Sequence, residues 1–296
     1  MKNALKQIGL MTSVMVGVWS FISGLTLGLM GFVDPSTFGP EEALGPLPSL
    51  ILVSILNVLV IVWFIHNTKL SGMKLGMLVF IIIFGVMFFM TQIETVYFNN
   101  VIEMPWQIIF STVLTGVGVG LVMSLLSMRY QKKLQETNPP SSGEESYPEK
   151  QEDLILKFIA LTFVYLVFYF ILGYYVAWQF PTLREYYSGS TDIIPFIKHM
   201  QNQVNTDTGL IFFQIFRGFL WTGIGYLVAI NTESKKKWER VVIVGLALSV
   251  GLATPLLVPN EYMPAAVRLG HFFEVLSQNF IFGALCALWF RPRNKA

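Results

Sequence analysis

The stretch LGMLVFIIIFGVMFFMTQIETVYF, residues 75–98, decides the fold of this 296-residue chain. Its only charged residue is Glu94, and the apolar residues before it follow one another without polar alternation. At 1.5 Å per residue, a helix needs about 20 apolar residues to cross a hydrocarbon core of about 30 Å. Because backbone groups in lipid must bond internally, this stretch predicts a transmembrane helix and not a barrel strand.

Apolar runs of similar length recur along the whole chain. Hydrophobic residues make up 54% of the sequence and charged residues 13%, whereas soluble proteins carry about 25% charged residues. The net charge of +2 gives no support for a nucleic-acid partner. These features predict an all-α, polytopic membrane helical bundle whose partner is the lipid bilayer. The eight expected transmembrane spans lie near residues 8–33, 49–66, 75–98, 107–128, 155–180, 208–230, 241–258 and 268–290.

The distribution of basic residues predicts the orientation of these spans. Lysine and arginine concentrate at both ends of the chain and in alternate connections, whereas the remaining connections carry only Arg184, Lys198 and Arg268. Basic residues are enriched on the cytoplasmic side of membrane proteins. The sequence therefore predicts a multi-pass protein of a cell membrane with both termini in the cytoplasm. The first apolar run is too long for a signal-peptide core, so we expect it to be a retained helix.

A polar segment, QKKLQETNPPSSGEESYPEKQED, follows the fourth expected span and is predicted to be a flexible cytoplasmic linker. It divides the chain into two four-helix halves, residues 1–129 and 154–296, joined by residues 130–153. Two short strings recur about 160 residues apart, Asn-Thr at 67 and 231 and Met-Pro at 104 and 263. We interpret them as traces of an internal duplication. An even number of helices in each half makes the repeats parallel.

Small residues and one amphipathic segment add detail to this expected bundle. Gly24 with Gly28, and Gly116 with Gly120, have the GxxxG spacing that permits close approach of helix backbones. The outer connection between the fifth and sixth spans is expected to hold a short interfacial helix around residues 193–203, with one apolar face.

Charged residues inside spans are rare and mark candidate sites. The third span supplies Glu94, the sixth Arg217, and the eighth His271, Glu274 and Gln278. At about 100° per residue, the three residues of the eighth span fall within about 60° on one face. All five residues lie in the outer half of the membrane or near its middle. We therefore expect one polar binding cluster, open or nearly open to the outside.

The residue types leave several roles for this cluster open. A structural ion pair would join Arg217 to Glu274 or Glu94, with His271 and Gln278 completing the hydrogen bonds, because an unpaired buried charge is costly. A binding or transport site would use Arg217, whose planar fork suits carboxylates and phosphates. The sequence leans toward this second role, with a small polar or anionic solute.

A third hypothesis is a metal-assisted intramembrane enzyme, for which His271 and Glu274 are weak candidate ligands and Glu94 a third. The sequence contains no HExxH, GxSxG or phosphate-binding loop motif, and it identifies no cofactor. A fourth hypothesis is a non-catalytic membrane subunit or scaffold in which the cluster is structural. Whether the protein is an enzyme stays open at this level.

Overall fold

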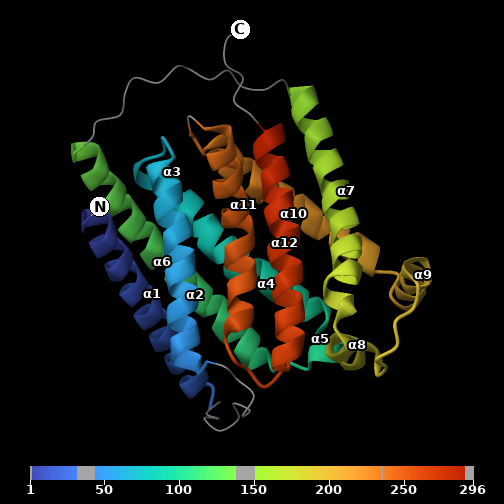
Figure 1. The fold of residues 1–296 in the computed structure, drawn as a ribbon. Helices are drawn as coiled ribbons and strands as arrows, with labels where there is room; N and C mark the ends of the chain where they lie inside the picture. Colours follow the sequence, from blue (N-terminus) through green and yellow to red (C-terminus); the bar gives the residue numbers. More distant parts are fainter. Residues whose placement is uncertain (1, 32–43, 138–150, 235, 291–296) are drawn as a thin grey trace.

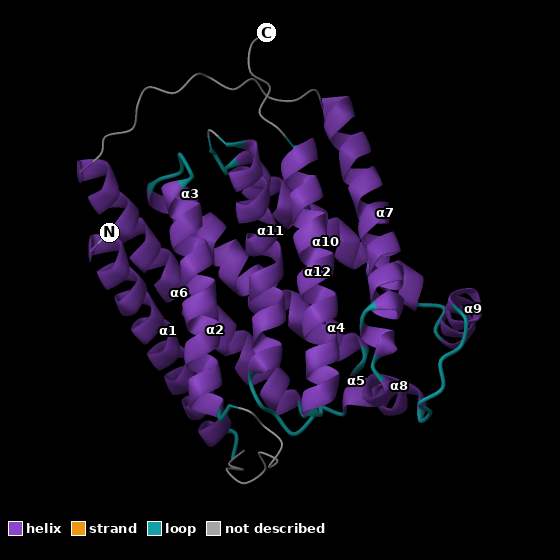
Figure 2. Cartoon of the chain, in the orientation of Figure 1, coloured by secondary structure: helices purple, strands orange, loops and turns teal. Residues whose placement is uncertain are grey.

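The computed structural model describes residues 2–31, 44–137, 151–234 and 236–290. Every regular segment in these ranges is helical (Figures 1 and 2). Eight helices are long and apolar enough to cross a membrane, which confirms the predicted all-α membrane bundle. These spans are Ala4–Leu29, Pro46–His66, Gly72–Tyr97, Trp106–Glu136, Gln151–Gln179, Leu210–Ile230, Lys237–Leu257 and Ala265–Trp289.

The part of the chain before residue 138 supplies the first four spans. The third span is built from three consecutive helices, α3, η1 and α4. Helix α1 packs against α2 and α6, and α3 packs against α6. The elements are α1 (Lys2–Leu29), α2 (Pro46–His66), α3 (Gly72–Phe80), η1 (Ile81–Phe89), α4 (Met90–Tyr97), α5 (Asn99–Ile102) and α6 (Trp106–Thr137).

The part after residue 150 supplies the other four spans and the longest ordered connection. Helix α7 packs against α10, and α11 packs against α12. Helix α11 also contacts α2 and η1, so it joins the two groups of spans. The elements are α7 (Gln151–Tyr175), η2 (Ala177–Gln179), α8 (Pro181–Ser188), α9 (Phe196–Thr206), α10 (Leu210–Ile230), α11 (Lys237–Ala253), η3 (Thr254–Leu257) and α12 (Ala265–Trp289).

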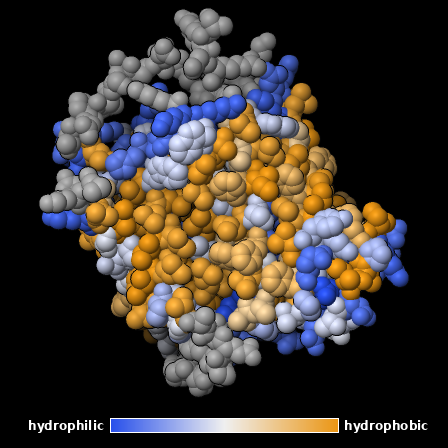
Figure 3. Space-filling model, in the orientation of Figure 1, coloured by the Kyte–Doolittle hydropathy of each residue, from blue (hydrophilic) through white to orange (hydrophobic). Residues whose placement is uncertain are grey.

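The surface of the bundle matches a lipid environment. On the face that Figure 3 shows, apolar residues cover the middle of the bundle, and hydrophilic residues gather near the top and at the lower right. Large apolar side chains point outward along this surface, for example Leu29 at 79% and Phe212 at 75% exposure. Aromatic residues such as Phe64, Phe88 and Trp221 are fully buried between the helices instead. The sides of the bundle are therefore suited to lipid, and aromatic packing fills its interior.

The bundle has two distinct ends. Helix α1 begins and α12 ends at the same end, which we call the terminal end (Figure 1). The opposite end, which we call the distal end, carries α5, α8 and α9. The interfacial helix expected at residues 193–203 is α9, Phe196–Thr206, and it begins after Pro195. Helix α8 in the same connection was not predicted, because its sequence is mostly polar.

Two local expectations from the sequence need revision. The linker expected at residues 130–153 is helical at both ends, since α6 continues to Thr137 and α7 begins at Gln151, and its middle, residues 138–150, lies outside the described residues. Polar residues continue a helix past the membrane whenever water can hydrate them, so polarity alone did not mark the helix ends. In the first GxxxG pair, neither Gly24 nor Gly28 has a neighbour within 4 Å of its added Cβ position.

The second GxxxG pair does pack closely. A Cβ atom at Gly116 would lie 2.5 Å from Phe88 Cγ, and one at Gly120 would lie 2.9 Å from Phe80 Cδ2. These two glycines of α6 therefore let the third span lie against α6 without a gap.

The middle of the third span, Ile81–Phe89, is a π-helix. A π-helix has wider turns than an α-helix and shifts the facing of every residue that follows it. The residues that follow form α4, which carries Thr91, Gln92 and Glu94. The π segment therefore sets which side of the third span presents Glu94.

Candidate functional site

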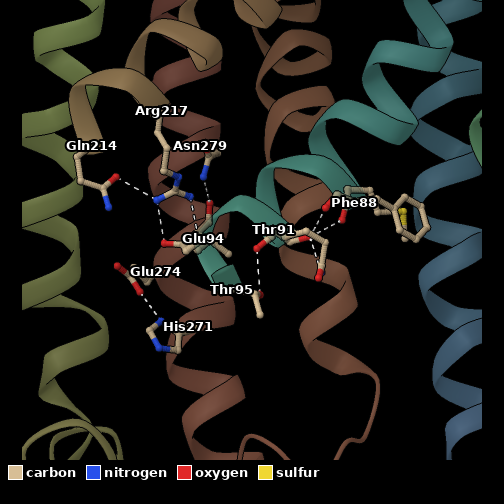
Figure 4. A network of polar contacts seen from close by, with 12 residues as sticks. Phe88, Thr91, Glu94, Thr95, Gln214, Arg217, His271, Glu274 and Asn279 are labelled. Carbon is tan, nitrogen blue, oxygen red and sulfur yellow. Dashed lines mark hydrogen bonds and ion pairs between the residues drawn. The ribbon is translucent and has the colours of Figure 1, made fainter. Parts of the chain in front are cut away.

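Arg217 of α10 and Glu94 of α4 form a two-pronged ion pair in the interior of the bundle (Figure 4). Arg217 Nη1 donates to Glu94 Oε1 at 2.8 Å, and Nη2 donates to Oε2 at 2.7 Å. Nη1 also donates to Gln214 Oε1 at 3.0 Å. This is the parallel geometry in which a guanidinium binds a carboxylate most strongly. Of the two partners predicted for Arg217, the structure selects Glu94.

The packing of α10 against α7 buries the guanidinium. Gln214, Arg217 and Trp221 lie on one face of α10 at intervals of three and four residues, and all three are buried. A Cβ atom at Gly218 would lie 2.8 Å from the backbone oxygen of Thr162 in α7. The missing side chain at position 218 therefore lets α7 approach α10 closely beside Arg217.

His271 and Glu274 of α12 form a second polar pair near the first. The two residues are separated by 2.7 Å between His271 Nδ1 and Glu274 Oε2. His271 Nε2 lies 3.0 Å from the hydroxyl of Tyr187 in α8. The tautomer that satisfies both contacts carries its hydrogen on Nδ1, so His271 donates to Glu274 and accepts from Tyr187. Burial raises the pKa of Tyr187 well above its ordinary value, which keeps this hydroxyl protonated as a donor.

Gln278 and Asn279 complete the polar face of α12. Gln278 is 2% exposed, and the structure records no hydrogen-bond partner for its side chain. Asn279 is 1% exposed and donates from Nδ2 to the backbone oxygen of Val275, but its Oδ1 is enclosed without a partner. The structural hypothesis expected Gln278 and His271 to complete the hydrogen bonds of the arginine pair. The recorded side-chain partners of Arg217 are instead Glu94 and Gln214.

A cavity of about 1560 Å³ connects these residues to the distal end of the bundle. All five predicted site residues line it: Glu94, Arg217, His271, Glu274 and Gln278. Its distal part is lined by residues of α5, α8, α9 and the connection between η3 and α12. The structure therefore brings the predicted cluster together on the wall of a single cavity.

Aromatic side chains form much of the remaining wall, and sequence reasoning did not include them in the site. Tyr97 stacks on Phe213 with ring centroids 3.9 Å apart, and its hydroxyl donates to both carboxylate oxygens of Asp207 at 2.8 and 2.9 Å. Tyr165 and Tyr169 of α7 line the deeper part. Tyrosines are common at membrane interfaces, so their sequence positions alone gave no signal that they face a cavity.

The metal hypothesis receives no support from the arrangement of these side chains. Both ring nitrogens of His271 are engaged, one with Glu274 and the other with Tyr187. Among the described residues, no group of three or more histidine, cysteine, aspartate or glutamate side chains is arranged to hold a metal ion.

The site is interpreted from its geometry alone, because no similar protein was found. Comparison of the chain with protein-family models, curated proteins and solved structures finds no match.

Proposed function

We propose that the cavity binds a small polar solute and that the protein recognises or translocates this solute across a membrane. The observation that supports the proposal best is the position of two polar pairs and of the amides of Gln278 and Asn279 on the wall of a cavity of about 1560 Å³. Ligand-binding cavities are typically concave, mostly apolar and supplied with a few convergent polar groups.

A purely structural role accounts for fewer of these features. An ion pair that only joined α4 to α10 would be expected to be enclosed on all sides, because neighbouring helices would exclude water from it. Glu94 is instead 29% exposed while Arg217 is 2% exposed, and the exposed side belongs to the cavity wall. The structural role also gives no reason for Gln278 to be buried without a partner. The binding role explains both features.

The sequence analysis favoured a small polar or anionic solute, and the site geometry gives less support to an anionic one. Both terminal nitrogens of Arg217 already donate to Glu94. An anionic solute would have to displace this carboxylate before it reached the guanidinium, and it would then lie beside the charge of Glu94. A neutral or cationic polar solute meets no such obstacle. The metal-assisted enzyme would likewise require His271 to leave Glu274 or Tyr187.

We place the protein in a cell membrane with both termini in the cytoplasm, so that the cavity opens to the outside. Basic residues support this orientation: Lys69 and Lys236 belong to connections at the terminal end, and Arg129 lies in the part of α6 that reaches the same end. At the distal end, Arg184 and Arg268 donate to backbone oxygens, including those of Thr191 and Met263.

The proposal is tested by native mass spectrometry of the full chain released from mild detergent, with a panel of neutral, anionic and cationic small solutes. We expect one solute class to give a stoichiometric adduct that is lost in Glu274→Gln and in the double variant Glu94→Gln/Arg217→Met. Lys69→Met removes an exposed ion pair at the other end and serves as the control that retains the adduct. A folded wild-type protein that binds no member of the panel would contradict the proposal.

A further inference from the structure

The charges on the cavity wall favour a positively charged solute. Among the described residues that line the wall, Arg217 supplies the one guanidinium, and none is a lysine. The carboxylates of the wall are those of Glu94, Asp192, Asp207, Glu261 and Glu274. Glu94 balances the charge of Arg217 through hydrogen bonds to its two terminal nitrogens, while Arg217 Nε has no partner. Glu274 is a buried member of the remaining carboxylates, and its negative charge attracts cations.

Glu274 is the deep carboxylate that has no arginine or lysine partner. Its Oε2 interacts with His271, and the structure records no partner for Oε1. A Cβ atom at Gly173 of α7 would lie 3.2 Å from Oε1, so the glycine leaves room around this oxygen. Glu274 therefore presents one acceptor oxygen that is not engaged by the protein.

Two amides next to Glu274 make no recorded hydrogen bond through their oxygen atoms. Gln278 lies one helical turn further along α12, is 2% exposed and has no recorded hydrogen bond. Asn279 Oδ1 is enclosed without a partner. Both residues line the cavity. Buried polar groups normally have hydrogen-bond partners, so unpartnered amides beside a carboxylate indicate an occupant that supplies donors.

The surrounding wall suits the apolar part of such a cation. Tyr165, Tyr169 and Phe170 of α7 line the cavity, as does Tyr187 of α8. Aromatic faces attract cations and pack against their alkyl groups. Carboxylate, amide oxygens and aromatic faces together match an ammonium group that carries N–H donors and an apolar substituent.

We infer that the cavity recognises a primary or secondary organic ammonium ion, whose N–H groups bind Glu274 Oε1 and the amide of Gln278. This assignment rests on the proposed binding function and names its solute class. Glu274 supplies the charge, Gln278 supplies a hydrogen-bond acceptor, and the tyrosines of α7 contact the organic part. His271 orients the Glu274 carboxylate through Nδ1.

The test is isothermal titration calorimetry of the full chain in lipid nanodiscs near neutral pH. Three probes of matched shape are compared: phenethylammonium, neutral phenethyl alcohol and anionic hydrocinnamate. We expect phenethylammonium to bind wild-type protein, and the other two probes to bind about tenfold more weakly or not at all. Loss of a charge-assisted hydrogen bond predicts that Glu274→Gln weakens ammonium binding by about ten- to a hundredfold.

Two further variants keep the test decisive. Gly173→Ala keeps every charge but places a methyl group against Glu274 Oε1, and we expect it to weaken ammonium binding severalfold. Glu185→Gln makes the same chemical change as Glu274→Gln on an exposed residue of α8 outside the cavity wall, and it should leave binding unchanged.

The ammonium assignment fails if phenethylammonium does not bind wild-type protein, or if it binds Glu274→Gln and Gly173→Ala as tightly as wild type. It also fails if hydrocinnamate binds in preference to phenethylammonium. The proposed function is judged separately by the solute panel. A neutral or anionic adduct there would overturn the ammonium assignment and retain the binding function, whereas an empty panel would overturn both.

Discussion

Arg217 and Glu94 form one ion pair, but the protein surrounds them differently. The side chain of Arg217 is 2% exposed and that of Glu94 is 29% exposed, on the cavity side. The free-energy cost of an unpaired charge therefore depends on which of the two partners is removed. Removing Glu94 strands a guanidinium among buried groups, whereas removing Arg217 leaves a carboxylate that water in the cavity can hydrate. Removing the exposed partner, Glu94, is therefore the more expensive change, because it leaves the buried charge unpaired.

This asymmetry gives a prediction for stability. We expect Glu94→Gln to destabilise the protein by about 3–5 kcal/mol, and Arg217→Met to destabilise it less. The double variant Glu94→Gln/Arg217→Met should be more stable than Glu94→Gln alone, because no charge remains unpaired. Thermal unfolding in detergent measures all three. Lys69→Met is the control, since its exposed pair with Glu233 should contribute about 0–1 kcal/mol. Equal losses for the two single variants would contradict the argument.

His199 of α9 gives a prediction for pH. Its side chain is 6% exposed and packs on Trp178, with ring centroids 4.3 Å apart. Burial lowers the pKa of His199 below its ordinary value of 6.5. The folded state therefore binds fewer protons than the unfolded state, and its stabilisation is present above about pH 6.5 and is lost as the pH falls below it. Hydrogen-exchange protection of α9, taken relative to the intrinsic exchange rate at each pH, should fall on acidification in wild type but stay constant with pH in His199→Gln.

At the scale of elements, the contact of α10 with α7 depends on a glycine. A Cβ atom at Gly218 would lie 2.8 Å from the backbone oxygen of Thr162, and a backbone atom cannot move aside alone. We expect Gly218→Ala to destabilise the protein by about 1–3 kcal/mol through overpacking. Gly223 on the same helix has no atom within 4 Å of its Cβ position, so Gly223→Ala should be neutral or stabilising. Comparable melting temperatures for the two variants would refute the close contact.

The sequence predicted the spans because each is set by one local property, the length of its apolar run. It also placed Glu94 and Arg217 on inward faces. It did not predict the π segment at Ile81–Phe89, because the apolar residues there lack the periodicity that distinguishes one helical pitch from another. It also missed Tyr187, because α8 is short and polar, and its contact with His271 depends on tertiary packing.

At the scale of the whole molecule, the two groups of four spans make matching contacts. In the first group, α1 contacts α2 and α6, and α3 contacts α6. In the second group, α7 contacts α10 and α12, and α11 contacts α12. Each of these three contacts has its counterpart four spans later, whereas the contact of α10 with α11 has no counterpart of similar extent in the first group. This correspondence supports our proposal that the chain consists of two parallel halves related by duplication.

The polar contacts between the two groups follow the same pattern. Asn57, in the second span of the first group, donates to Thr254, in the third span of the second group, at 2.8 Å. Arg217, in the second span of the second group, pairs with Glu94, in the third span of the first group. If the halves are duplicates, these two contacts between the groups are equivalent, and one is a neutral hydrogen bond while the other is an ion pair. The candidate site would then have arisen by specialisation of one of the two equivalent contacts. This explains why the site uses spans from both halves.

The orientation of the bundle decides which side of the membrane the cavity faces, and single cysteines can measure it. The only native cysteine, Cys286, is buried, so Cys286→Ser supplies a background without thiols. Ser190 is exposed at the distal end and Ser71 is exposed between α2 and α3 at the terminal end. In our proposed orientation, which rests on the positive charge near the terminal end, that end lies in the cytoplasm. A membrane-impermeant maleimide should therefore label Ser190→Cys in intact cells, and Ser71→Cys only after permeabilisation. The reverse pattern would turn the cavity toward the cytoplasm, and the carboxylates on its wall would then bind solutes from inside the cell.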